Sequence, residues 1–235
     1  MRKFIVYSAI LGILLVLAIP LYSQLRKVSH QQQAREQFEK RVRAMTQGQQ
    51  AGAEWGRRGQ RDVDHTLRRR PETRSDPRAK FVQKLRFIKG KLPGSAPDFT
   101  GTTLAGTSVR LHSLKGNWVL INFWATWCPS CRQEMPSLQR LWSTFRERNF
   151  VLIGINVQES RNTARQFANT YDIQFPVIAD RNGRIADKYR VTGIPETVLI
   201  DPSGHVLGKA IGYRHWDNKP SRQFFDRVLQ NSPRP

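Results

Sequence analysis

Short apolar runs alternate with longer amphipathic stretches in the second half of the chain. Apolar runs bounded by polar or glycine residues are typical of buried strands, whereas apolar residues at intervals of three and four predict helices. The runs predict strands at residues 118–123, 150–157, 197–200 and 205–211. The helical spacing predicts helices at residues 129–148, 161–171, 185–189 and 221–229. Strands and helices in this order favour an α/β fold with a mixed central sheet.

The stretch before the first of these strands has a different pattern. Residues 99–114, FTGTTLAGTSVRLHSL, consist of short segments punctuated by glycine and serine. This pattern is typical of a hairpin. We therefore expect an N-terminal β-hairpin as an extension in front of the sheet.

An uncharged apolar run, FIVYSAILGILLVLAIPLY, extends from Phe4 to Tyr22. A helix of this length is sufficient to cross a hydrocarbon core of roughly 30 Å. A cleavable signal peptide is the alternative, but it requires a shorter apolar region and a small-x-small cleavage site. Only Leu21-Tyr22-Ser23 weakly matches such a site. We expect residues 1–25 to form an uncleaved membrane anchor.

Residues 26–92 are poor in aliphatic residues and rich in glutamine, arginine and glycine. They carry nineteen positive and seven negative charges, and so supply more than half of the formal net charge of +21 of the chain. A segment of this composition buries too little apolar surface to offset the entropy lost on ordering. We expect a basic linker, largely disordered or partly helical, in front of a folded domain at residues 93–235.

Both cysteines of the chain, Cys128 and Cys131, lie three positions apart in NFWATWCPSCRQEM, residues 122–135. A metal site needs about four ligands, and the five histidines show no second pair at ligand spacing, so no metal is expected. Two inert buried thiols are the plainer alternative. The pair, however, follows a predicted strand and opens a predicted helix, where free N–H groups and the helix dipole lower the pKa of a thiol. Cys-x-x-Cys in this position indicates a redox couple.

The position of each cysteine in the predicted helix suggests its role. We expect Cys128, at the exposed start of the helix, to form the mixed disulfide with a partner. Cys131, one turn further in, would resolve that disulfide by displacing the partner thiol. Pro129 suits the first helical turn, because its missing N–H removes no helical hydrogen bond. The intervening Pro129 and Ser130 do not reveal the direction of electron flow.

The run from Phe123 to Pro136 resembles the membrane-anchored thiol:disulfide oxidoreductases of the TlpA, ResA and CcmG (DsbE) group. The similarity covers about residues 95–212 and includes the segments APDF at 96–99, LKG at 114–116, FPV at 175–177 and VTGIPETVLID at 191–201. It implies a thioredoxin fold with a β-hairpin extension and a central mixed sheet flanked by helices. It also implies that Pro195 is a cis-proline facing the cysteines.

The resemblance suggests roles for further residues near the cysteines. A glutamate at the place of Glu134 is buried in the CcmG branch and assists proton transfer, although a carboxylate in the first turns of a helix is also favourable without such a role. Glu196 either shapes the partner groove or is a solvated loop charge. Asn122 replaces the buried aspartate of thioredoxin, and an amide cannot accept a proton. We expect the partner to contact Trp127, Pro129, Ser130 and Ile194.

Dithiol–disulfide exchange is the activity that the resemblance implies, with reduction as the leading hypothesis. The Cys128 thiolate would attack a substrate disulfide, and a membrane electron donor of the DsbD/CcdA type would reduce the resulting Cys128–Cys131 disulfide. The substrate would be apocytochrome c or another exported protein disulfide, and no prosthetic group is needed. A disulfide-forming oxidant is the closest alternative, because it uses the same cysteines with the opposite electron flow.

The expected location of the domain rests on the family resemblance more than on the distribution of charge. The basic linker after the apolar run opposes the positive-inside tendency for an exported domain, but the family works outside the cytoplasmic membrane. We expect the domain to face the periplasm or an equivalent space. A tethered adaptor is a different hypothesis, in which the linker binds anionic lipid at roughly 1 kcal/mol per Lys or Arg. No nucleic-acid recognition motif is present, so nucleic acid is not an expected partner.

Overall fold

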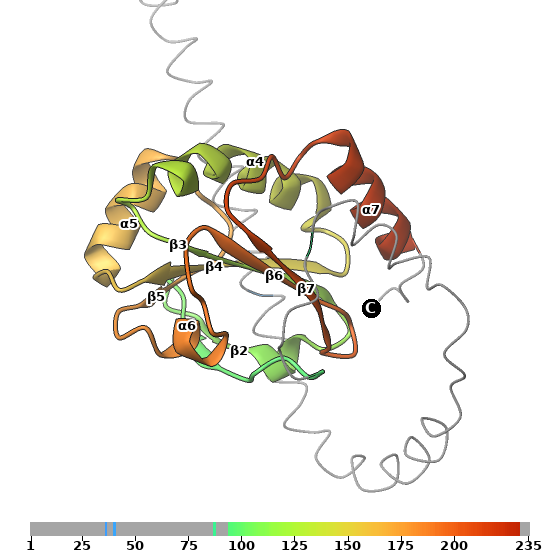
Figure 1. Ribbon diagram of the computed structural model, residues 1–235, viewed down its shortest axis with the longest axis horizontal. Helices are drawn as coiled ribbons and strands as arrows, with labels where there is room; N and C mark the ends of the chain where they lie inside the picture. Colours follow the sequence, from blue (N-terminus) through green and yellow to red (C-terminus); the bar gives the residue numbers. More distant parts are fainter. Residues whose placement is uncertain (1–35, 37–39, 41–86, 88–93, 231–235) are drawn as a thin grey trace, which may run out of the picture. The chain divides into compact units, whose positions relative to one another are not determined.

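Five strands form the central sheet of the protein, in the order β5-β4-β3-β6-β7. The computed structural model describes residues 36, 40, 87 and 94–230, and Figure 1 shows how their elements are arranged. Strands β3, β4 and β5 are parallel, whereas β6 pairs antiparallel with both β3 and β7. The strands are β3 (Trp118–Trp124), β4 (Phe150–Val157), β5 (Val177–Asp180), β6 (Glu196–Ile200) and β7 (Val206–Ile211).

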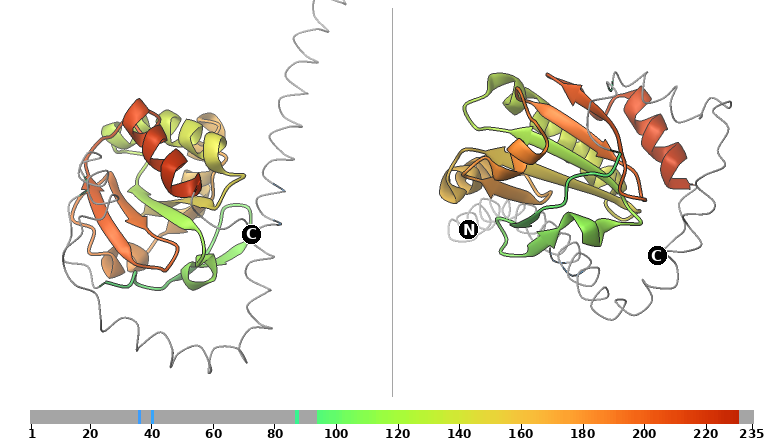
Figure 2. Two further views of the ribbon diagram at one scale, coloured as in Figure 1. Left: turned by 90° about the vertical axis from the view of Figure 1, so that its right-hand side faces the viewer. Right: turned by 60° about the horizontal axis from the view of Figure 1, so that its bottom comes forward.

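Helices cover both faces of this sheet (Figures 1 and 2). One face carries α4 (Pro129–Phe145), α5 (Arg161–Thr170) and α7 (Lys219–Gln230), and the other carries the short α6 (Arg184–Lys188). All seven residues of β3 are buried, because a central strand covered on both faces has no solvent-facing side. Aromatic pairs join the layers: Trp124 packs on Phe167 of α5, and Phe150 packs on Phe225 of α7.

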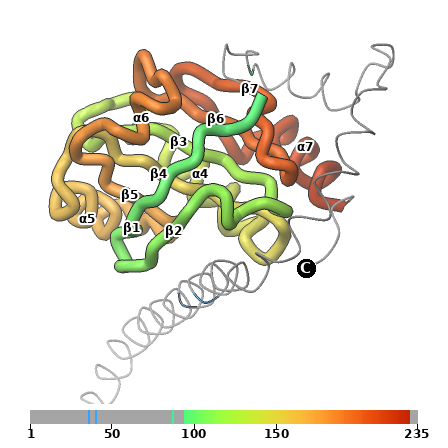
Figure 3. Tube along the Cα trace, turned by 90° about the horizontal axis from the view of Figure 1, so that it is seen from below, coloured from blue at the N-terminus to red at the C-terminus, as the bar shows by residue number. Residues whose placement is uncertain are grey.

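The predicted hairpin is present. Strand β1 (Thr100–Thr102) pairs antiparallel with β2 (Ser108–Arg110), and the 3-10 helix η1 (Leu111–Leu114) follows. The extended chain before the hairpin crosses the sheet on the same side as α6 (Figure 3). It begins near β7, where Val206 N donates to Gly94 O, and leads into the hairpin, whose Leu104 N donates to Val177 O of β5.

The predicted thioredoxin-like α/β fold is thus confirmed, with one strand more than the apolar runs indicated. Strand β5 has only four residues and follows Pro176, so it shows no alternation of its own. It packs beside β4 at Gly154, where a Cβ atom would lie 2.9 Å from the Phe175 ring. Glycine therefore permits a close approach that the sequence pattern does not indicate.

The predicted anchor at residues 1–25 lies outside the described residues, as does most of the predicted linker at 26–92. In the part of the chain that the structure describes, no helix is long and apolar enough to cross a membrane. The continuously described part of the chain begins at Gly94.

Candidate active site

The two cysteines form a disulfide at the N-terminus of α4, directly beyond the end of β3. Cys128 is the N-cap residue of the helix, and its Sγ accepts a hydrogen bond from the Cys131 N–H at 3.2 Å. Cys128 is 4% exposed and Cys131 is 0% exposed. A partner therefore reaches the disulfide through Cys128.

The surface beside Cys128 is apolar and open. The Trp127 side chain is 65% exposed, which is unusual for a large aromatic ring in a well-packed domain. Pro129 is exposed at the first position of α4, and the half-buried Ser130 places its Oγ 3.4 Å from Cys128 Sγ. These residues form a small contact surface around Cys128.

The loop before β6 closes the other side of the disulfide. The Ile194–Pro195 peptide bond is cis, and the Ile194 carbonyl oxygen lies 3.8 Å from Cys128 Sγ. The Pro195 carbonyl accepts a hydrogen bond from Gly212 N at 2.8 Å, which fixes the loop to the end of β7. The structure thus places the Ile194–Pro195 segment beside Cys128.

Glu134 lies on α4, three residues after Cys131 and therefore on the adjacent turn of the same helix face. It is fully buried, and its two carboxylate oxygens accept hydrogen bonds from Asn122 Nδ2 at 2.7 Å and from Arg214 N at 3.1 Å. Burial raises the pKa of Glu134 to about 7, although the hydrogen bonds from Asn122 and Arg214 oppose this rise. A group that titrates near neutral pH can both take up and release a proton.

Asn122 on β3 orients this carboxyl group. Its Nδ2 donates both to Glu134 and to Thr197 Oγ1, the latter at 3.0 Å, which connects α4 with β3 and β6. The amide cannot accept the proton that a buried aspartate would accept at this position. The neighbouring Glu134 provides the titratable oxygen instead.

Comparisons with known proteins agree with this geometry. The model of the AhpC/TSA family matches residues 94–208. The thiol-disulfide oxidoreductase ResA of Bacillus cereus is 36% identical over 132 residues, which cover 56% of this chain and 75% of ResA. This chain belongs to the TlpA/ResA/CcmG family of thiol-disulfide oxidoreductases.

A second relative and a solved structure extend the comparison. The thioredoxin-like protein YneN of Bacillus subtilis is 39% identical over 120 residues, which cover 50% of this chain and 69% of YneN. A solved structure, described as a thiol:disulfide interchange protein DsbE from Chlorobium tepidum, is similar with a TM-score of 0.54 and 30% identity. The similarity covers 61% of this chain and 99% of that one. The oxidoreductase therefore has the Cys-x-x-Cys pair and the thioredoxin-like fold of an enzyme that exchanges thiols and disulfides.

In this oxidoreductase, the Glu196 side chain lies on the opposite face of the sheet from that of its neighbour Thr197. Adjacent residues of a strand point to opposite faces of a sheet, so Glu196 faces away from Asn122 and Glu134. It is 1% exposed, and its carboxylate accepts a hydrogen bond from Lys209 Nζ at 2.5 Å. Lys209 also donates to the Tyr189 carbonyl. The pair fastens the two ends of the loop that carries Pro195.

The sequence did not single out Glu159, which positions the turn before Cys128. Its carboxylate accepts hydrogen bonds from Thr126 N at 2.8 Å, from Thr126 Oγ1 at 2.5 Å and from Asn156 Nδ2 at 2.6 Å. Parallel strands β3 and β4 end at the same edge of the sheet, so residues that follow them lie close together. In the sequence, an acidic residue just after the strand β4 is the signal that could have indicated this role.

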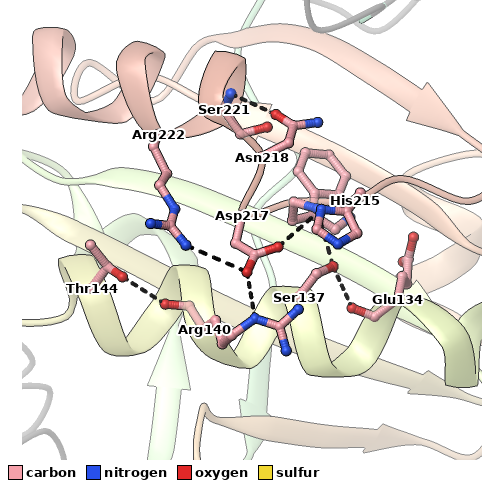
Figure 4. Close-up of polar contacts among 10 residues, drawn as sticks. Glu134, Ser137, Arg140, Thr144, His215, Asp217, Asn218, Ser221 and Arg222 are labelled. Atoms are coloured by element: carbon pink, nitrogen blue, oxygen red, sulfur yellow. Dashed lines mark hydrogen bonds and ion pairs between the residues drawn. The ribbon is translucent and has the colours of Figure 1, made fainter.

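The loop between β7 and α7 is fastened along one face of α4 (Figure 4). Arg214 N donates to Glu134, and Trp216 N donates to Ser137 Oγ at 3.1 Å. Ser137 Oγ in turn donates to the Glu134 carbonyl at 2.8 Å. The position of the β7–α7 loop thus determines how the buried Glu134 carboxyl group is covered.

Asp217 completes the attachment of this loop to α4. Its carboxylate forms ion pairs with Arg140 of α4, with Arg222 of α7 at 3.6 Å and with His215 at 3.1 Å when the imidazole is protonated.

In the described residues, no group of three or more His, Cys, Asp or Glu side chains is arranged to hold a metal ion.

Proposed function

We propose that this oxidoreductase reduces disulfides of exported proteins, with apocytochrome c or one of its maturation partners as the substrate. The observation that carries the mechanism is the buried Glu134, whose carboxyl group lies one helical turn after Cys131 and titrates near neutral pH. The family resemblance supports the class of substrate.

Cys128 begins the exchange as a thiolate that attacks one sulfur of the substrate disulfide. One substrate thiol leaves, and a mixed disulfide joins Cys128 to the other sulfur. Cys131 then loses its proton to Glu134 and attacks Cys128 Sγ, which releases the second substrate thiol. Two electrons pass from the cysteines to the substrate, and the Cys128–Cys131 disulfide is formed.

The place of Glu134 favours a reductant over a strong oxidant. A strongly oxidising disulfide requires a reduced form that is stabilised, usually as a thiolate. An ionised carboxylate one turn from Cys131 disfavours a second negative charge on that sulfur, because like charges repel in a buried site. The reduced form therefore gains stability from the Cys128 thiolate alone, and this favours electron donation by the pair.

The reduction potential of the Cys128–Cys131 couple tests this direction. The full chain is equilibrated in defined thiol buffers, and the fluorescence of Trp127 and its neighbours reports the fraction oxidised. We expect a potential near or below that of thioredoxin, about −270 mV. A value near that of DsbA, about −120 mV, would identify an oxidant and contradict the reductase proposal.

A trapping experiment tests the substrate. Cys131→Ala leaves Cys128 able to form a mixed disulfide that cannot be resolved, so natural partners should accumulate as covalent complexes. Cys128→Ala is the control and should form no such complexes. A trapped set without c-type apocytochromes or their maturation proteins would remove the substrate proposal and leave the exchange activity in place.

We also propose that residues 1–25 anchor the protein in the cytoplasmic membrane, with the domain on the periplasmic or equivalent side. A membrane electron donor of the DsbD/CcdA type would then reduce the Cys128–Cys131 disulfide. The apolar run from Phe4 to Tyr22 supports the anchor, and the family resemblance supports the side. A reporter fused after Pro235 should be active outside the cytoplasm, and activity in the cytoplasm alone would contradict the proposal.

A further inference from the structure

Trp216 forms part of the cover over the Glu134 carboxyl group. The residue is buried, and its backbone N–H donates a hydrogen bond to Ser137, one turn after Glu134 on α4. The indole N–H lies close enough to the Glu134 carboxylate to favour its ionised form. It does not meet the geometry of a hydrogen bond to any described residue. The buried ring also keeps water away from the carboxyl group.

Phe87 packs against this same ring. It precedes the folded domain by several residues, within the basic segment whose composition predicts no core of its own. Nevertheless it is only 6% exposed, and its ring centroid lies 5.9 Å from that of Trp216 at an interplanar angle of 49°. This separation and tilt are those of a favourable aromatic pair. A residue outside the sheet and its helices thus contacts the residue that covers Glu134.

We propose that Phe87 is a positioning residue for the redox centre, which acts by holding the Trp216 ring beside the Glu134 carboxylate. Loss of the Phe87 ring exposes one side of the indole and loosens its fit, so that water gains access to the carboxyl group. Because burial is the largest cause of the raised pKa of Glu134, hydration lowers this pKa towards its ordinary value. The segment before the domain thereby adjusts the proton affinity of the group that serves Cys131.

Several other groups surround the Glu134 carboxyl group. Arg214 is the charged residue that faces it from the β7–α7 loop, and both its N–H and its charge lower the pKa of Glu134. Strand β3 contributes the neutral Asn122 amide, which also binds the Thr197 hydroxyl of β6. The cysteines on α4 are the other titratable groups nearby. A test in the oxidised state excludes them, because a disulfide does not titrate.

The test is a carbon-13 NMR titration of the glutamate carboxyl groups in the oxidised full chain. The Glu134 signal is assigned by its loss in Glu134→Gln. We expect a midpoint near 7 for the unaltered chain, and a midpoint lower by about one pH unit in Phe87→Ala, which is a tenfold lower proton affinity. Phe87→Leu should remain near the unaltered value because it keeps an apolar cover, and Phe87→Val should lie between.

Tyr171→Ala is the matched control, because it removes an aromatic ring from the Phe167–Tyr171 pair at the end of α5. Its Glu134 midpoint should not move. Equal Glu134 midpoints in the Leu, Val and Ala variants of Phe87 would overturn the proposal. This holds even if their melting temperatures fall, because the contact would then be purely structural. If Phe87→Ala does not fold, Phe87→Val carries the same test. The inference rests on Glu134 as the proton acceptor, but its readout does not depend on the direction of electron flow.

Discussion

Glu134 keeps its proton at pH values where an exposed glutamate is ionised, and this lowers the stability of the fold at neutral pH. Its pKa is about 7 in the folded state and 4.5 in the reference state. Between these values the folded state binds one more proton than the unfolded state, so the free energy of unfolding falls as pH rises. The difference in pKa corresponds to about 3 kcal/mol.

Glu134→Gln should remove this loss. Relative to the unaltered protein, we expect the oxidised variant to gain stability as pH rises from about 4.5 to 7, by at most about 3 kcal/mol. The gain is reduced because the new amide group must face either Asn122 Nδ2 or Arg214 N, which are both donors. Urea denaturation of both proteins at pH 5 and pH 8 measures the difference. A stability difference that is the same at both pH values would contradict the assigned pKa.

Glu159→Gln should slow the exchange reaction by loosening the turn before Cys128. A glutamine has one acceptor oxygen for the three donors that Glu159 now satisfies, so one or two of them lose their hydrogen bonds. We expect a loss of about 2 kcal/mol in stability and about tenfold in the rate at which reduced Cys128 attacks a small disulfide.

The control for this variant is Glu147→Gln, which alters an exposed glutamate at the end of α4 that pairs with Arg146. Its stability and rate should stay close to those of the unaltered protein, because exposed pairs contribute little. A full reaction rate in Glu159→Gln would show that the turn keeps its shape without the carboxylate.

Sequence reasoning identified the residues of the site whose roles depend on local position. The two cysteines and Glu134 lie at the start of one helix, so their spacing alone places them together. Pro195 and Ile194 were found through a family resemblance, because nothing in their spacing connects them to a helix more than sixty residues away. Glu159 and Lys209 were missed for the same physical reason, since each meets its partners only after the strands have paired.

At the level of elements, the attachment of the β7–α7 loop to α4 depends on Asp217. Burial alone would raise the pKa of this carboxyl group, but the ion pair and hydrogen bond with Arg140 hold it below its ordinary value. A carboxyl group with a lowered pKa stabilises the fold at pH values above its unfolded pKa. This contribution is lost as pH falls through the folded pKa.

Asp217→Asn should therefore destabilise the protein by about 2 kcal/mol at pH 7, because hydrogen bonds to charged groups are lost. The difference should shrink as pH falls below about 4, because the unfolded chain is protonated there and the folded carboxylate approaches its own lowered pKa. Thermal unfolding at pH 7 and pH 3 measures it. Asp226→Asn is a suitable control, because Asp226 of α7 pairs with Arg148, just after α4, but is exposed. An equal loss in both variants would show that burial of Asp217 has no effect.

The elements that the sequence predicted least well are the short ones at the edge of the sheet. Strands β3 and β4 have long apolar runs and were placed within one or two residues. Strand β5 has four residues, and it is fixed by pairing with β4 and by a bridge between Thr103 and Ile178. Both contacts come from distant parts of the sequence, so no local pattern indicates them.

At the scale of the whole molecule, the charges are unevenly divided between segments. Residues 26–92 carry a net charge of +12, from nineteen positive and seven negative residues, while residues 93–235 carry eighteen positive and eleven negative residues. A concentrated positive charge next to a membrane anchor would attract anionic lipid headgroups. We propose this as a secondary role of the linker.

A peptide of residues 26–92 should co-sediment with vesicles that contain anionic lipid and should be released by salt. Screening weakens such binding, because the Debye length falls from about 10 Å at 0.1 M to about 3 Å at 1 M ionic strength. Vesicles of neutral lipid provide the control and should bind little. Binding that is indifferent to both lipid charge and salt would remove the proposal.

The path of the chain into the domain has a mechanical consequence. Gly94 and Ala96 are hydrogen-bonded to the turn between β6 and β7, at Val206 N and Gly204 O. This turn lies at the end of the sheet where β3 begins, whereas Cys128 follows the end of β3. Tension applied to the domain through Gly94 would thus act first on the β6–β7 turn and strain the far edge of the sheet. A pull that comes from further upstream would meet the Phe87–Trp216 contact before it reached this turn.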